Sequence, residues 1–130
     1  MPCVARTQPG TRSHAHTRAR RYTFGGYAEA GWGGDYSWAT EAAGDFLFRL
    51  GPGAAAAYRP TGADTRYQYR DPSYWPLWGW GTDLTFGGGG ALGHYGFCNQ
   101  GSTYAGAPNA ACGGDGNWGA TEMEVWYPVP

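Results

Sequence analysis

Hydrophobic and polar residues alternate in short segments that end at glycine or proline. In residues 46–50, Phe46, Phe48 and Leu50 share one face, and a Gly-Pro pair ends the segment. Similar segments are residues 22–27, 66–69, 83–86 and 92–97. Short strands separated by glycine-rich turns are typical of antiparallel sandwiches. The pattern therefore predicts a mainly β chain, folded as a two-sheet antiparallel β-sandwich with few short helices.

The last segment, residues 122–127, alternates most clearly. Its apolar face carries Met123, Val125 and Tyr127, and its other face carries Glu122, Glu124 and Trp126. One face of each sandwich strand packs against the opposite sheet. We therefore expect the apolar face of this strand to meet Phe46 and Phe48 inside the sandwich.

Little of the chain favours helix. Residues 37–43 are the best candidate, with Ser37 as N-cap and Glu41 in the first turn, and we expect one or two helical turns there. Residues 54–57 are alanines with high helical propensity, but four residues are too few to hold a helix alone.

Aromatic residues replace the aliphatic residues that usually fill a core. The chain has no Ile, 5 Leu, 3 Val and 5 Phe in 130 residues, but it has 7 Trp and 10 Tyr. Each buried ring removes roughly 150–250 Å² from water, so we expect a core built of rings. The chain also has no Lys, and a helical bundle, which needs Leu, Ala, Glu and Lys at helical spacing, is excluded.

The charges divide the chain into two parts. Residues 1–28 carry five arginines and no acid, whereas residues 29–130 carry four arginines and ten acids. We interpret residues 1–22 as a basic flexible N-terminal arm and residues 23–130 as the folded domain. An organelle transit peptide stays open as an alternative for the arm, which lacks the hydrophobic stretch of a secretory signal.

The overall charge and the hydropathy give no support for two kinds of partner, nucleic acid and membrane. A formal net charge of −1 gives no indication of nucleic-acid binding. No apolar run approaches the roughly 20 residues of a membrane span, so we expect no membrane insertion.

Three cysteines do not make a disulfide framework. Cys3, Cys98 and Cys112 are an odd number, and no secretory signal precedes them. This pattern favours free thiols in a reducing compartment, so we expect an intracellular, cytoplasmic protein. Pairing of Cys98 with Cys112 stays open, because spacing alone does not show that two cysteines meet.

The sequence offers no convincing catalytic, metal or cofactor site. Gly88, Gly90 and Gly93 match the dinucleotide pattern G-x-G-x-x-G, but the residues that follow are not helical. A bound pyrophosphate needs a helix N-terminus at that place. The cysteines lack the C-x-x-C pair that anchors a zinc site. We therefore expect no cofactor, no metal and no catalytic activity.

The order of several short motifs resembles that of the TLDc domain family. Phe24-Gly25-Gly26-Tyr27, Trp32 and Phe46-Leu47-Phe48 resemble its F-G-[AG]-[YF], W and F-L-F succession. Two later segments resemble F-G-x-G-x-D-L and C-N-x-G-S-x-Y, and they supply Gly79, Gly81, Asp83, Leu84, Gly101, Ser102 and Tyr104. The last segment resembles the closing [ST]-E-[IM]-E-V-[WF] strand, with Glu122, Glu124, Val125 and Trp126. The match spans residues 24–127.

The resemblance implies a noncatalytic protein-interaction module, built as a two-sheet sandwich flanked by helices. It also implies a link to oxidative stress protection and to the peripheral subunits of the vacuolar proton-pumping ATPase (V-ATPase). Most of the motif residues are expected to be structural, while Glu122, Glu124 and Trp126 form a candidate contact surface. TLDc domains carry a further half before the F-G-G-Y motif, which residues 1–22 do not match, so we expect a shortened version.

Two other functions stay open. Four rings lie within seven residues, Tyr74, Trp75, Trp78 and Trp80. If exposed, they would stack on sugar rings in a carbohydrate-binding β-sandwich module. Because the core needs aromatic rings, we favour their burial. The other hypothesis is a peroxide-reactive thiol at Cys98, which needs a cationic neighbour, and only His94 is close in sequence.

Overall fold

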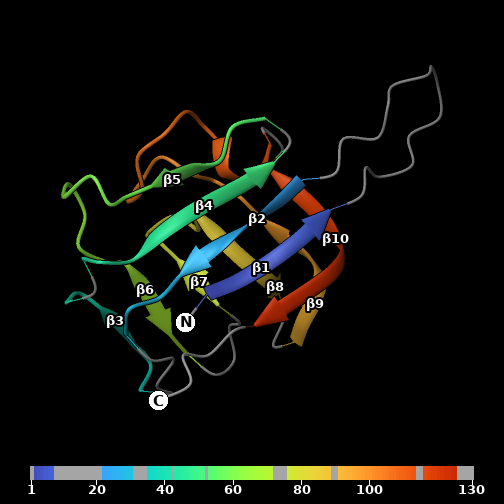
Figure 1. Cartoon of the computed structure of the whole chain (residues 1–130). Helices are drawn as coiled ribbons and strands as arrows, with labels where there is room; N and C mark the ends of the chain where they lie inside the picture. The colour runs from blue at the N-terminus through green and yellow to red at the C-terminus, as the bar shows by residue number, and fades with distance from the viewer. Residues whose placement is uncertain are drawn as a thin grey trace, which may run out of the picture.

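The protein is mainly β, as its computed structural model shows (Figure 1). The structure describes residues 2–7, 22–30, 35–41, 43–51, 53–71, 76–88, 91–113 and 116–125. Within these residues the strands are β1 (Pro2–Thr7), β2 (Tyr22–Tyr27), β3 (Ser37–Ala39), β4 (Phe46–Gly51), β5 (Ala56–Tyr58), β6 (Gln68–Arg70), β7 (Leu77–Trp78), β8 (Leu84–Gly88), β9 (Ala91–Phe97) and β10 (Asn117–Val125). A short 3₁₀ helix, η1, spans Ala110–Cys112.

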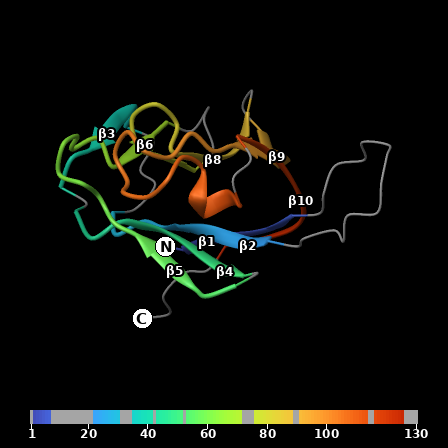
Figure 2. The same ribbon diagram turned by 90° about the horizontal axis from the view of Figure 1, so that it is seen from above.

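The strands form two antiparallel layers that share β10. The hydrogen-bonded order across the described strands is β3-β6-β7-β8-β9-β10-β1-β2-β4-β5. Residues 117–119 of β10 pair with β9, and residues 120–125 pair with β1 after a register shift that skips Thr121. Figure 2 shows the layer of β1, β2, β4 and β5 facing the layer of β3, β6, β8 and β9, with η1 between them. The predicted two-sheet antiparallel sandwich is confirmed.

The N-terminal strand β1 corrects one sequence-based expectation. Residues 2–7 pair with β10 on one side and with β2 on the other, so they are not part of a flexible arm. The physical reason is that backbone hydrogen bonds to two neighbours hold this strand, and these do not depend on a hydrophobic side-chain pattern. Residues 8–21, the remainder of the predicted arm before β2, lie outside the described residues.

The helix expected in residues 37–43 is also wrong. Residues 37–39 form β3, which pairs with β6 in the register Trp38 opposite Tyr69. The two rings lie 4.9 Å apart. A cross-strand aromatic pair of this kind stabilises a strand and outweighs the weak local preference for helix.

The core is made of rings, as the composition predicts. Phe24, Trp78 and Phe86 are fully buried. Trp118 packs edge-on against Phe24 and Phe86, with ring centroids 5.2 and 5.1 Å apart. Leu47 is one of the few buried aliphatic residues in this cluster. The rings come from β2, β7, β8 and β10, so they join the two layers of the sandwich.

Strand β4 has the orientation opposite to the one expected. Leu47 is fully buried, whereas Phe46 and Phe48 are half-buried and Leu50 is 57% exposed. Register places Leu47 in one row with Gly26 and Val125, so Phe46 and Phe48 do not share a face with Val125. The inner face of β4 also carries Arg49, whose guanidinium donates to Ala110 O of η1, so the polar residue in this alternation does not mark the outer face. Tyr127 lies outside the described residues.

Candidate functional site

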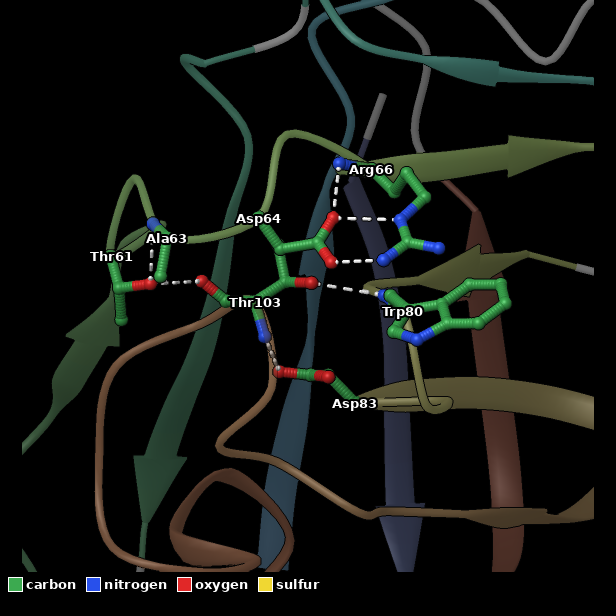
Figure 3. Close-up of polar contacts among 7 residues, drawn as sticks. All are labelled: Thr61, Ala63, Asp64, Arg66, Trp80, Asp83 and Thr103. Carbon is green, nitrogen blue, oxygen red and sulfur yellow. Dashed lines mark hydrogen bonds and ion pairs between the residues drawn. The ribbon is translucent and has the colours of Figure 1, made fainter.

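Asp83 joins two of the motif segments. This buried side chain follows the turn after β7, and its Oδ2 accepts hydrogen bonds from the backbone N–H groups of Gly101, Thr103 and Tyr104 at 3.2, 3.0 and 2.9 Å. Burial raises the pKa of Asp83, and these backbone donors oppose the shift. One carboxyl group therefore holds the loop after β9 against the turn before β8 (Figure 3).

Two glycines allow the turn and the loop to approach closely. Gly79 has a φ of +78°, and a Cβ there would lie 2.6 Å from Asp83 Cγ. Gly81 has a φ of +88°, and its Cβ would lie 2.7 Å from Ser102 Oγ. Positive φ is accessible to glycine at low cost. The sequence motif residues Gly79, Gly81 and Asp83 thus act together as a structural unit.

The same turn presents Trp80 to solvent. Its backbone N–H donates to Thr103 Oγ1 at 2.9 Å, and its side chain is 49% exposed. The guanidinium of Arg66 lies 3.7 Å from the ring centroid of Trp80 (Figure 3). Asp64 accepts two hydrogen bonds from the Arg66 side chain. These hydrogen bonds lower the pKa of Asp64 and raise that of Arg66.

Two further rings continue this surface along the outer side of the sheet. Trp38 lies 5.8 Å from Trp80 at an interplanar angle of 66°, and it contacts Tyr69 on β6. We call Trp38, Tyr69 and Trp80 the indole cluster. The prediction that the tryptophans are buried is correct for Trp78 and wrong for Trp80, while Trp75 lies outside the described residues.

A second group of rings lies on the outer face of the other layer. Tyr27 and Phe46 stack with centroids 5.1 Å apart, and Phe46 lies 6.2 Å from Phe48. The Arg59 guanidinium lies 5.3 Å from the centroid of Phe46. We call Tyr27, Phe46, Phe48 and Leu50 the outer aromatic patch. Three of its members belong to the sequence motifs, but they do not contribute to the core.

The remaining motif residues have mixed positions. Phe24, Gly25, Gly26, Leu84 and Tyr104 are buried, and Gly101 and Ser102 are exposed in the loop that Asp83 holds. Glu122, Glu124 and Val125 lie in β10, and Glu124 is half-buried. Trp32 and Trp126 lie outside the described residues. The structure therefore separates a buried structural set from a smaller outward-facing set.

A second buried acid lies near Tyr104. Asp45 is fully buried, and its Oδ1 accepts the backbone N–H of Glu29 at 2.6 Å. Burial raises the pKa of Asp45 to about 7, the Glu29 N–H opposes this, and the charges of Glu29 and Glu41 add to the increase. Asp45 and Asp83 both add to the effect of burial, which raises the pKa of Tyr104. Both buried acids accept hydrogen bonds from backbone N–H groups, so each one fixes a neighbouring segment of the chain.

Cys98 and Cys112 form a disulfide, so the expectation of free thiols is wrong for this pair. Their Cα atoms lie 6.3 Å apart, and the bond ties the residue after β9 to η1. A peroxide-reactive free thiol at Cys98 is therefore not supported. An odd number of cysteines does not exclude a disulfide. Here two of the three cysteines lie 14 positions apart in the sequence and meet across the loop.

The described residues give no sign of a metal or membrane site. They hold no group of three or more His, Cys, Asp or Glu placed to bind a metal ion. No helix among them is long and apolar enough to cross a membrane. Comparison with protein-family models, with curated proteins and with solved structures finds no match to this chain.

Proposed function

We propose that this chain is a noncatalytic protein-interaction module of the TLDc type, linked to oxidative stress protection and to the peripheral subunits of V-ATPase. The observation that carries the proposal is the junction at Asp83. Two motif segments, separated by 17 residues in sequence between Asp83 and Gly101, contact each other through this carboxyl group. Motifs that form one folded unit support a shared family origin better than isolated matches.

The outward-facing motif residues supply the contact surface in this proposal. Tyr27, Phe46 and Phe48 form a partly exposed ring group, and register places Glu124 on the same face. Aromatic residues are enriched at protein interfaces, and a nearby acid favours a partner with complementary charge. The buried motif residues maintain the fold that holds this face.

The experiment is capture of purified V-ATPase peripheral subunits on the immobilised protein. We expect capture by the native chain and a loss of at least tenfold in affinity for Phe48→Ser, because a ring at the centre of the contact is removed. Tyr36→Ser is the matched control, since Tyr36 is 63% exposed and belongs to the other layer. No capture by the native chain, or equal capture by both variants, would contradict the proposal.

Carbohydrate binding is a second candidate, favoured by the exposure of Trp80. This chain is poor in aliphatic residues, so burying an indole would stabilise its fold. Trp80 is nevertheless 49% exposed, on a turn that a hydrogen bond to Thr103 holds in place. Arg66 covers one side of the ring, so a sugar would stack on the other side. We expect a shift of tryptophan fluorescence with a bound oligosaccharide and none in Trp80→Ala. An unchanged spectrum across a glycan panel would remove this candidate.

A further inference from the structure

We infer that Trp80 and Arg66 form one preorganised binding site for an acidic oligosaccharide, and that Thr103 is the buried residue that positions both. This inference rests on the carbohydrate-binding candidate and deepens it. The first observation is the exposure of Trp80. Arg66 covers one face of the indole, yet the residue is 49% exposed, so the opposite face is open to solvent. An open aromatic face offers the apolar surface on which the C–H groups of a sugar ring pack.

The turn that carries Trp80 has a strained backbone. Gly79 and Gly81 have positive φ, and Thr82 has a φ of +67°, a rare value for a β-branched residue. Asn99 holds the end of this turn, since its backbone N–H donates to Thr82 O at 3.1 Å and its Nδ2 donates to Gly81 O at 3.0 Å. Such strain persists where the surrounding structure enforces it, and it is concentrated at ligand sites.

Thr103 connects this turn to the loop that carries Arg66 (Figure 3). Thr103 is fully buried, and its Oγ1 accepts the backbone N–H of Trp80 at 2.9 Å. Its carbonyl oxygen accepts the backbone N–H of Thr61 at 2.9 Å, and its own N–H donates to Asp83 at 3.0 Å. One buried residue therefore fixes both loops, and a site on fixed supports binds a ligand without a large ordering cost.

Arg66 determines the charge of the ligand. Asp64 accepts hydrogen bonds from Nε and Nη2 of Arg66, which form one edge of the guanidinium. Nη1 has no hydrogen-bond partner among the described residues, and the Arg66 side chain is 36% exposed (Figure 3). The edge formed by Nη1 and Nη2 is therefore open to a ligand. Its two parallel N–H groups match the two oxygens of a carboxylate, which a neutral sugar lacks.

The geometry also sets the length of the ligand. The Arg66 guanidinium lies 3.7 Å from the indole centroid on one face of Trp80, whereas the sugar stacks on the other face. A single sugar residue therefore does not reach both partners. We expect one residue to stack on Trp80 while the carboxylate of the next residue passes the ring edge and pairs with Arg66. Trp38 is inclined at 66° to Trp80, so the two rings form no flat platform for a layered polysaccharide. The ligand is a soluble chain that contains a uronic acid.

Titration of the ¹⁵N-labelled chain, followed by its indole N–H signals, tests this with a galacturonic acid trimer, a neutral galactose trimer and the galacturonic acid monomer. The acidic trimer is expected to bind about tenfold more tightly than either of the others at low salt, and to lose this advantage at high salt. Trp80→Ala is expected to abolish the binding of both trimers. Phe97→Ala is the matched control and should bind as the native chain does, because Phe97 is 47% exposed and lies on β9.

Two further variants separate charge from positioning. Arg66→Gln should lower the affinity for the acidic trimer to that for the neutral trimer, and leave the neutral trimer within about twofold. Thr103→Val removes the acceptor of the Trp80 N–H and should weaken both trimers by about fivefold or more, whereas Thr103→Ser keeps the hydroxyl and should restore binding. Circular dichroism and thermal melting establish that each variant folds.

The outcomes distinguish this inference from the candidate function beneath it. Equal affinity for the acidic and neutral trimers would overturn the acidic ligand and leave carbohydrate binding in place. Binding of no saccharide would overturn both. A sulfated trimer that binds more tightly than the uronic acid trimer would overturn the carboxylate assignment. Unchanged binding by Thr103→Val, or failure of Thr103→Ser to restore it, would overturn the positioning role.

Discussion

Gly26 lies directly against the indole of Trp78. A Cβ built on Gly26 would lie 2.5 Å from Trp78 Cε2, and Trp78 Nε1 donates to Tyr27 O at 3.2 Å. The ring is thus fixed above a position in β2 that carries no side chain. This contact links the two layers of the sandwich, and it explains why a glycine occupies the middle of a buried strand.

Gly26→Ala is therefore expected to destabilise the protein by about 2 kcal/mol or more, because Trp78 is fully buried and has little room to move. Gly51→Ala is the matched control, since a Cβ there meets no atom within 4 Å. The control is expected to change the free energy of unfolding by about 0.5 kcal/mol or less. Urea denaturation measures both. Equal effects would contradict the close contact.

Asp83→Ala is expected to cost about 3 kcal/mol or more, because the backbone N–H groups of Gly101, Thr103 and Tyr104 lose their acceptor. Asp83→Asn keeps one carbonyl oxygen and is expected to cost less. Hydrogen exchange of the three amides localises the effect. If exchange rises equally in both variants, the carboxyl group does not act as the acceptor described.

Asp45 makes the stability depend on pH. Its pKa is 3.8 ordinarily and about 7 in the folded protein. Between these values the folded state holds a proton that the unfolded state has lost. The free energy of unfolding should therefore fall as pH rises, by about 1.4 kcal/mol per pH unit, and level off above about pH 7.

Asp45→Asn removes this titration, so its stability should vary less between about pH 4.5 and pH 8 than that of the native chain. Urea denaturation at several pH values gives both curves. Parallel curves for the two proteins would show that Asp45 ionises normally.

Reduction of the disulfide between Cys98 and Cys112 is expected to cost about 3 kcal/mol, because the bond limits the unfolded chain. For a domain of this size that corresponds to a melting temperature about 10 °C lower. The double variant Cys98→Ala/Cys112→Ala should melt at the lowered temperature with or without reductant. Cys3→Ser should still respond to reductant. A native chain that melts identically in both conditions would contradict a structural role.

The sequence predicts well those elements whose signals are local. β2 has the predicted bounds of residues 22–27, and β4 begins at the predicted Phe46, with a Gly-Pro pair at the end of its pattern. The ring-built core also follows from composition, since a chain with so few aliphatic residues has little else to bury.

Other features depend on contacts between distant residues, and the sequence does not reveal them. The orientation of β4 depends on Leu47 fitting beside Gly26, not on its own alternation. The strand at residues 37–39 depends on Tyr69, which lies about 30 positions away in the chain. In the sequence Asp83 stands out only as one residue of a family motif, and nothing indicates that it accepts three backbone hydrogen bonds. The exposed pair of Arg66 and Trp80 had no sequence signal beyond the tryptophan itself.

The pairing of β1 with β10 has a consequence for biosynthesis. In the order of synthesis residues 2–7 precede every other described strand, but their partner strand β10 follows all of them. One edge of β1 therefore stays without its hydrogen-bonding partner until β10 has been made. Nascent chains with such long-range closure fold slowly and expose adhesive edges meanwhile. We expect the sandwich to close only once β10 has been made, and to need chaperone protection until then.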